Sequence, residues 1–307
     1  MIAERPADDS SATGPAEGPG PAEGPGPTSS TVLRIMVGAR LRRLREAGQV
    51  TRAAAADAIR ASEAKISRME TGRARFKVRD LTDLLQMYGV GDPQRQELLD
   101  LAEQANAAGW WQQYDDVLAG WFENYIGLEQ ATSIIRTYQP QFVPGLLQTA
   151  SYARAVVELG YPDDTAARND RRVALRLARQ ELLEGASGPK VWAAVDEAAL
   201  RRPIGGAAVR TEQLRHLLEI TERPNVTLQL VPFDLGGHAA AGGPFTILRF
   251  PGPDLPDVVY LEQLTSALYL DRRADTDHYM AVMDRLCAAA DSPEQTRRFL
   301  ERLLAQS

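Results

Sequence analysis

The chain has 307 residues, of which 44% are apolar and 25% charged, and its formal net charge is −6. This length exceeds that of a typical single domain and the composition allows a buried core, so we expect two folded domains. The single cysteine, Cys287, excludes a disulfide framework and a zinc site of several thiolates, while the absence of a secretory signal and of long apolar runs predicts a cytoplasmic protein without membrane segments.

Residues 1–31 are rich in glycine and proline and contain the hexapeptide GPAEGP twice. Such a composition offers too few apolar side chains to bury. We therefore predict a disordered tail over 1–31.

Helical patterns begin at Val32, where apolar residues recur at helical spacing up to the Ala47-Gly48 stop. Thr51 and Ser62 are placed as N-caps of two short helices joined by a tight turn. Residues 78–90 and 92–109 predict a fourth and a fifth helix, the last one ending at Gly109. The sequence thus predicts a compact all-α domain of five helices over 32–108.

Six of the chain's twenty aromatic residues lie between Trp110 and Tyr125. Aromatic residues at helical spacing are usually core residues, so we favour a packing anchor over a ligand-stacking site.

The rest of the chain, 109–307, mixes the two periodicities. Helical spacing is found at 148–159, 165–183, 211–221, 275–290 and 293–304. Strand patterns are found at 190–195, 225–233, 245–250 and 257–262. We predict an α+β domain with a small sheet covered by helices on one side. Asp196 and Glu197 are interpreted as a strand end followed by a helix N-terminus, where the helix dipole favours carboxylates.

Charge is divided unequally between these parts. Residues 32–80 contain thirteen Arg and Lys against five Asp and Glu, a net charge of +8, which leaves −14 for the rest. A small basic domain beside an acidic one is the pattern expected of nucleic-acid binding. In the second short helix Ile66 and Met69 are predicted to face inward, which leaves the opposite face of its N-terminal half to read a DNA groove.

The segment from Leu41 to Arg75 resembles the lambda-repressor-like, Xre-type helix-turn-helix, most closely in S-x-x-x-I-S-R-M-E-x-G-R from Ser62 to Arg73. The resemblance covers 32–90 and implies double-stranded DNA as a partner. It also implies a structural ion pair between Arg45 and Glu70.

By this analogy, some residues are predicted to read base edges and others to hold the phosphate backbone. The base-reading candidates are Glu63, Ala64, Lys65 and Arg68, and the phosphate candidates are Arg52, Ser62, Ser67, Arg73, Arg75 and Lys77. Arg68 is the best candidate for a bidentate contact with guanine. Glu63 has the wrong sign for DNA; it either accepts from a cytosine amino group or complements the helix dipole, and we favour the dipole.

The larger half is similar to a C-terminal domain of unknown function that follows such helix-turn-helices in antitoxin-like regulators of high-GC filamentous bacteria. The similarity rests on several segments, among them VPGLLQT at 143–149, which we interpret as a turn followed by a helix cap. It implies a transcriptional regulator, often with a small partner protein.

Three roles remain open for this half: homodimerisation, because one reading helix covers too few base pairs, binding of a small partner protein, and sensing of a small-molecule effector. An enzyme is not predicted, because the chain contains no G-K dipeptide, no H-E-x-x-H and no G-x-S-x-G. We expect His216 to be a hydrogen-bonded structural residue and His238 to be a solvated loop residue, and we expect no cofactor and no metal.

Overall fold

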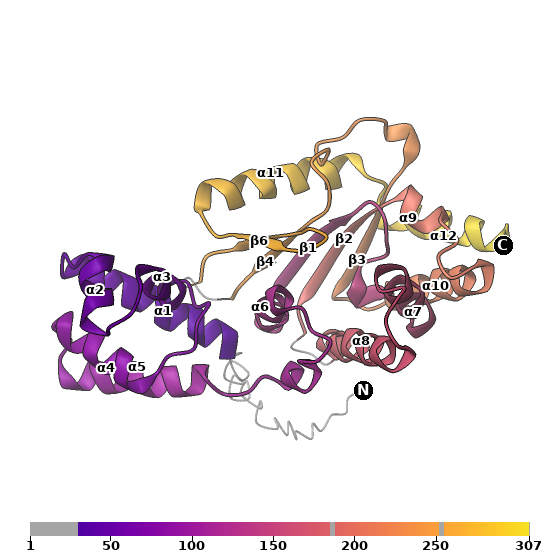
Figure 1. Cartoon of the computed structure of the whole chain (residues 1–307). Coiled ribbons are helices and arrows are strands. Elements are labelled where there is room, and N and C mark those ends of the chain that lie inside the picture. The colour runs from indigo at the N-terminus through magenta and orange to yellow at the C-terminus, as the bar shows by residue number, and fades with distance from the viewer. Residues whose placement is uncertain (1–29, 185–187, 252–254, 307) are drawn as a thin grey trace, which may run out of the picture.

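The computed structural model describes residues 30–184, 188–251 and 255–306. The predicted tail therefore lies outside the described residues, apart from its last two positions, which begin the first helix. The described residues form a small helical domain followed by a larger domain built around a sheet (Figure 1). The predicted multidomain architecture, all-α and then α+β, is confirmed.

Five helices make up the first domain. They are α1 (Ser30–Ala47), α2 (Arg52–Ala58), α3 (Glu63–Glu70), α4 (Val78–Met87) and α5 (Asp92–Ala105). Their apolar faces meet in one core, in which Leu41, Ile66, Met69 and Leu84 are fully buried. Burial of these apolar faces supplies most of the stability that short helices lack on their own.

Local capping explains where several helices begin. The side chains of Thr51 and Ser62 accept hydrogen bonds from the backbone amides of Ala54 and Lys65, as expected of N-caps. The fifth helix is shorter than predicted, because Asn106 ends it. The side chain of Asn106 accepts from the Phe76 amide at 3.1 Å and donates to the Phe76 carbonyl at 2.6 Å.

The aromatic segment is a packing element, as predicted. It forms a 3-10 helix, Trp110–Tyr114, and then α6 (Gly120–Glu129). Trp111 is buried against Ile126 of α6 and against Leu175, which lies on a helix of the larger domain. Phe122 and Tyr125 stack with their ring centroids 5.1 Å apart.

A six-stranded mixed sheet organises the larger domain. Its strands are β1 (Ile134–Gln139), β2 (Lys190–Asp196), β3 (Val226–Val231), β4 (Phe245–Arg249), β5 (Val258–Glu262) and β6 (Ala267–Leu270). The order is β3-β2-β1-β4-β5-β6, with β1 to β3 parallel and β4 to β6 antiparallel. The sequence predicted four of these strands, which correspond to β2, β3, β4 and β5. It did not predict β1 and β6. Parallel β1 carries buried residues on both faces, so its sequence lacks the alternation of a half-exposed strand.

Helices cover both faces of this sheet, so the expectation of cover on one side is wrong. The remaining helices are α7 (Ala150–Gly160), α8 (Ala166–Ala178), α9 (Glu197–Arg201), α10 (Ala207–Ile220), α11 (Arg273–Ala289) and α12 (Pro293–Ala305). One face packs against α10 and α12, through residues such as Leu217 and Leu300. The other face packs against α11, through Met283 and Leu286, and Figure 1 shows α11 on that side. As predicted, Asp196 ends β2 and caps α9 by accepting from the Ala198 amide.

The first helix belongs to both domains. Val32, near its start, is part of the core of the larger domain, whereas Val37 and Leu41 lie in the core of the helical domain. Thr31 packs so closely on Gly127 of α6 that a Cβ at Gly127 would lie 2.0 Å from the Thr31 hydroxyl oxygen. α1 therefore ties the two domains together. At 18 residues it is the longest helix of the described ranges, and none of these helices combines the length and hydropathy needed to cross a membrane.

The VPGLLQT segment is held by side chains from two helices. Gln213 of α10 accepts from the Thr149 amide and donates to the Leu147 carbonyl, both within 2.8 Å. Gln180 donates to the Gly145 and Gln148 carbonyls. The predicted helix cap is present, and it is the side chain of Thr149 at the start of α7. These bonds satisfy backbone groups that would otherwise be buried without partners, which gives the segment a structural role.

Both expectations for the histidines are corrected. His238 is half-buried: its Nδ1 accepts from the Ala240 amide, and its Nε2 lies 3.2 Å from the Tyr138 hydroxyl. His216 is half-buried, and its Nε2 has no hydrogen-bond partner in the described structure. Within the described ranges, no three His, Cys, Asp or Glu side chains are grouped as metal ligands.

Replacing His216 with leucine is expected to make the protein less sensitive to acid. Burial lowers the pKa of His216 below its ordinary value, with nearby Glu219 opposing and Arg223 reinforcing the shift. The unfolded chain therefore takes up a proton at a higher pH than the folded chain, so stability falls as pH drops below about 6.5. Urea unfolding of the wild type and of His216→Leu at neutral and mildly acidic pH tests this. The wild type should lose more stability than the variant on acidification, and an equal loss would contradict the assignment.

Candidate nucleic-acid interface

The pair α2–α3 is positioned by buried contacts on one side of α3. Ile66 and Met69 are fully buried, as predicted, so α3 packs on the core by one face. α1 crosses this helix at Gly38, where a Cβ would lie 2.4 Å from the Met69 carbonyl oxygen. Only glycine permits this close approach, which fixes the depth of α3 in the domain.

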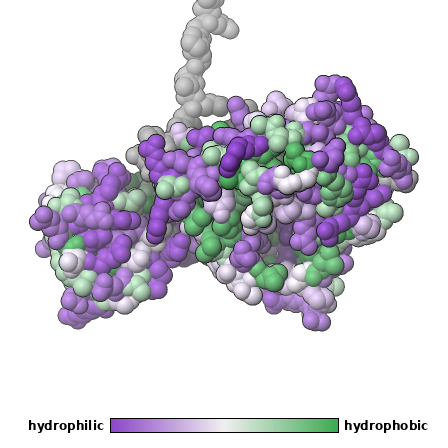
Figure 2. Space-filling model, turned by 90° about the horizontal axis from the view of Figure 1, so that it is seen from above, coloured by the Kyte–Doolittle hydropathy of each residue, from purple (hydrophilic) through white to green (hydrophobic). Residues whose placement is uncertain are grey.

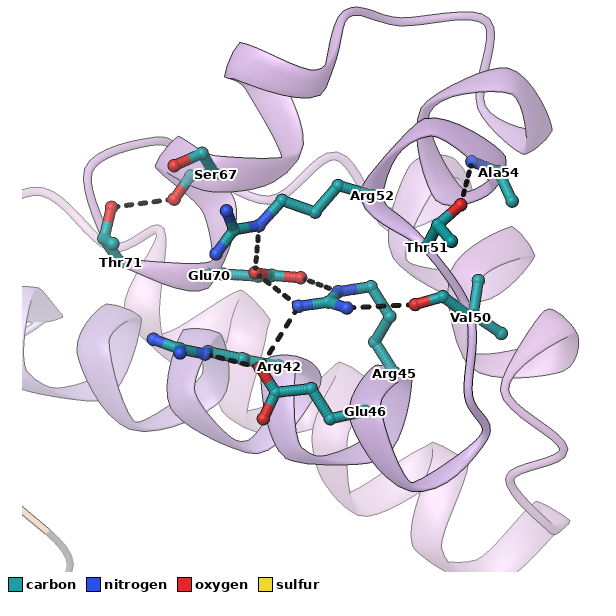
Figure 3. A network of polar contacts seen from close by, with 10 residues as sticks. All are labelled: Arg42, Arg45, Glu46, Val50, Thr51, Arg52, Ala54, Ser67, Glu70 and Thr71. Carbon is teal, nitrogen blue, oxygen red and sulfur yellow. Dashed lines mark hydrogen bonds and ion pairs between the residues drawn. The ribbon is translucent and has the colours of Figure 1, made fainter.

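A buried ion-pair cluster fastens α3 to α1 and α2 (Figure 3). The Glu70 carboxylate accepts from Arg45 Nε and, at 3.2 Å, from Arg45 Nη2. Arg45 also donates to the Val50 carbonyl at 2.9 Å. The bond to Glu70 is the main cause that raises the pKa of Arg45. We call Arg45, Arg52 and Glu70 the Glu70 cluster.

Arg52 belongs to this cluster, although the sequence suggested a phosphate contact. Its Nε donates to Glu70 at 3.2 Å, while its side chain stays 42% exposed. The exposed part can still approach a phosphate, but the guanidinium charge is shared with a carboxylate. Its electrostatic pull on DNA is therefore reduced.

The outer face of α3 carries the base-reading candidates. Glu63, Ala64 and Arg68 are exposed, and Ser67 is half-buried. Ser62 uses its hydroxyl as the N-cap, and Glu63 lies in the first turn, where the helix dipole favours a carboxylate. The Arg68 guanidinium makes no hydrogen bond or ion pair with any described residue, so it is free to bind an external acceptor.

Lys65 is held differently from Arg68. Its ammonium is ion-paired with Asp80 in the first turn of α4, and the Lys65 side chain is only 29% exposed. A contact between Lys65 and a base would require this pair to open. The structure thus separates two residues that the sequence treats alike.

The basic residues after α3 lie on the surface. Arg73, Arg75 and Lys77 are exposed. In the view of Figure 2 the surface of the helical domain is largely hydrophilic, whereas apolar residues gather on the larger domain. The charge of Arg75 contributes to the lowered pKa of buried Arg34, a shift caused mainly by burial. Arg73 lies against the larger domain, where it lines a pocket with Tyr269 and Asp271.

Two exposed arginines of this surface were not predicted. Arg60 lies in the turn between α2 and α3 with a φ of 52°, a conformation that residues other than glycine seldom adopt. Arg79 lies in the first turn of α4. The basic run from Arg73 to Arg79 was a sequence signal for Arg79, whereas nothing local marked Arg60.

Comparison with known families gives two matches. Residues 37–98 match a family described as a helix-turn-helix domain, and residues 122–302 match a family described as a domain of unknown function, DUF5753. No curated protein and no solved structure matches the chain. The first match covers α2 and α3, and it indicates a DNA-binding regulator.

Proposed function

We propose that this chain, which belongs to the DUF5753 family and carries a helix-turn-helix domain before it, is a sequence-specific transcriptional regulator without catalytic activity, acting on chromosomal DNA in the cytoplasm. The observation that carries the proposal is the outer face of α3. An N-capped helix, braced from behind by the Glu70 cluster, presents an unpaired arginine to solvent beside exposed cations. This arrangement suits a helix that enters the major groove.

Within this proposal, Arg68 is the principal base-reading residue. An exposed, unpaired guanidinium can bind O6 and N7 of guanine without breaking an internal contact. Glu63 and Ala64 lie beside it on α3. Lys65 contacts a base only if its ion pair with Asp80 opens. The phosphate contacts are assigned to the N-cap, to Ser67 and to the flanking cations. These residues are Arg52, Ser62, Ser67, Arg73, Arg75 and Lys77.

The proposal includes a homodimer. One α3 reads only a few base pairs, and two copies on a two-fold operator supply the affinity that one lacks. The larger domain then has the role of receiving a signal and changing the geometry or charge of the DNA-binding surface.

A second function for the larger domain is binding of a small partner protein, in the manner of an antitoxin-like switch. The observation that favours it is a set of exposed apolar side chains on this domain. Leu264 and Leu268 lie on the β5–β6 hairpin at the sheet edge, and Trp192 is 38% exposed on β2. Exposed large apolar residues at a sheet edge, such as Leu264 and Leu268, can mark an interaction surface.

Replacing Arg68 with alanine is expected to remove discrimination at one operator position, at a loss of about 1 to 3 kcal/mol for the preferred base. Replacing Arg75 with alanine is expected to weaken all sequences alike, because a phosphate contact carries no sequence information. The operator is first selected from random duplex DNA with the full chain, where a two-fold repeated site is expected of a dimer. Binding of each variant is then measured on the operator and on its single-base variants.

The same operator tests the electrostatic part of the proposal. Affinity should fall with salt, with a log-log slope of about −0.9 for each phosphate contacted. A slope near zero, or no sequence enriched by the selection, would reject DNA binding as the function. Equal and uniform losses for Arg68→Ala and Arg75→Ala would reject the role of Arg68 alone.

A further inference from the structure

A solvent-open pocket lies where the helical domain meets the larger domain. One wall is formed by Ile35 of α1 and by the turn Thr71-Gly72-Arg73 that follows α3. The opposite wall is mainly apolar and comes from the larger domain, with Leu128, Phe250 and Tyr269. A mainly apolar lining with a few polar side chains is typical of a site for a small organic molecule.

The turn that forms this pocket wall follows the DNA-reading helix α3 directly in the chain and is hydrogen-bonded to it. Gly72 has a φ of +68°, and a Cβ there would lie 2.7 Å from the Ile35 Cα, so the turn is seated directly on α1. The Arg73 amide donates to the Arg68 carbonyl at 2.8 Å. A molecule in the pocket therefore contacts Arg73, and the Arg73 amide is hydrogen-bonded to the last turn of the reading helix.

Arg73 is the one cation among the described lining residues of the pocket. Arg34, buried beside the pocket wall, donates to the Thr31 hydroxyl at 2.8 Å, and the charge of Glu123 opposes the lowering of its pKa by burial, so Arg34 is not available to a ligand. Arg73 faces Tyr269, whose pKa its charge lowers against the larger raising effect of burial. Asp271 is the one carboxylate among the described lining residues. The described lining therefore carries one positive and one negative charge, and the Arg73 guanidinium makes no hydrogen bond or ion pair with any described residue. A ligand carboxylate can pair with this guanidinium without breaking an internal contact, while its apolar body lies against the apolar wall.

We propose that this pocket binds a small molecule with an apolar body and a carboxylate, and that the bound carboxylate pairs with Arg73 and withdraws it from the DNA phosphate. Operator affinity then falls when the ligand is bound. This inference rests on the proposed function, because it assigns Arg73 to the DNA backbone. It identifies the signal by its chemistry and gives the direction of its effect.

Three carboxylates serve as probes: phenylacetate, indole-3-acetate and 4-methylpentanoate, each with its neutral amide as a control. At millimolar concentration at least one acid is expected to bind the full chain saturably, as measured by calorimetry, while its amide binds more weakly. At saturation that acid should lower operator affinity about fivefold or more, the lower end of ordinary allosteric coupling. The magnitude of the log-log salt slope should fall by about 0.9, the value of one lost phosphate contact.

Two variants locate the effect. Asn124→Phe places a ring in the pocket from half-buried Asn124 on α6, and it should abolish the response to the acid while leaving operator affinity unchanged without it. Gln130→Phe, which adds the same ring at an exposed position at the end of that helix, should respond like the wild type. Asp271→Asn removes the competing carboxylate at an exposed position, so it should bind the acid more tightly.

Several results would overturn the inference. These are saturable binding by none of the three acids, an unchanged or increased operator affinity, an unchanged salt slope, or weaker acid binding by Asp271→Asn. If Asn124→Phe fails to fold, Asp271→Asn decides the question. Operator binding by the ligand-free chain is measured in the same experiment, so a failure of DNA binding itself is distinguished from a failure of the pocket.

Discussion

Replacing Glu70 with alanine is expected to lower the unfolding free energy of the helical domain by about 3 to 5 kcal/mol. The Glu70 side chain is 1% exposed, and that of its partner Arg45 is 9% exposed. Removing the carboxylate leaves a buried guanidinium with only the Val50 carbonyl and the exposed Glu46 as acceptors. An uncompensated buried charge is costly, and α3 loses its attachment to α1 at the same time.

Hydrogen exchange of peptides from α1 to α5 measures this loss in the domain where it occurs. The matched control is Arg42→Ala, which breaks an exposed pair with Glu46 on the same helix and should cost no more than about 1 kcal/mol. The double variant Arg45→Met, Glu70→Leu should recover most of the lost stability, because apolar residues of similar volume leave no unpaired charge. If Glu70→Ala is no more destabilising than Arg42→Ala, the cluster does not fasten the reading helix.

Replacing Arg179 with methionine is expected to destabilise the larger domain by a similar amount, about 3 to 5 kcal/mol. Arg179 donates to both oxygens of Glu129, at 2.8 and 2.7 Å, and both side chains are buried. The guanidinium also lies 5.0 Å from the ring centroid of Phe122 and 5.4 Å from that of Tyr125. Methionine fills the volume but leaves the Glu129 carboxylate buried without its partner.

Tryptophan fluorescence during urea unfolding reports on this domain, because all four tryptophans of the chain follow residue 109. Arg171→Met is the control: Arg171 pairs with Asp116 at 2.7 Å, but both side chains are more than 40% exposed. Its loss should stay within about 1 kcal/mol. Equal midpoints for Arg179→Met and Arg171→Met would show that the buried pair adds nothing beyond a surface pair.

Much of the helical domain was predictable because its signals are local. Thr51 and Ser62 cap helices in the structure as their positions in the sequence indicated, and Ile66 and Met69 are buried as their spacing indicated. The predicted strands at 190–195 and 245–250 correspond to β2 and β4 for the same reason. Each of these features depends on residues within about one turn or one strand.

The predictions that were wrong depend on distant residues. The end of α5 is set by the contact of Asn106 with Phe76, thirty positions away. β1 is a strand because β2 and β4 pair with it on either side, and its own six residues carry no clear alternation. His238 is half-buried and lies within hydrogen-bond distance of the Tyr138 hydroxyl, because the loop that carries it packs on β1.

The segment ASEAKISRMETGRARFK shows the same division within the candidate interface. Composition and periodicity alone establish that it is a basic, N-capped helix followed by a tight glycine turn, because charge and capping are properties of neighbouring residues. Only the folded chain distinguishes Lys65, paired with Asp80, from Arg68, which faces solvent, and only it places Arg73 in a pocket with Tyr269. Both outcomes depend on which segments α4 and the larger domain bring beside α3, and such long-range packing is not encoded in any short stretch of sequence.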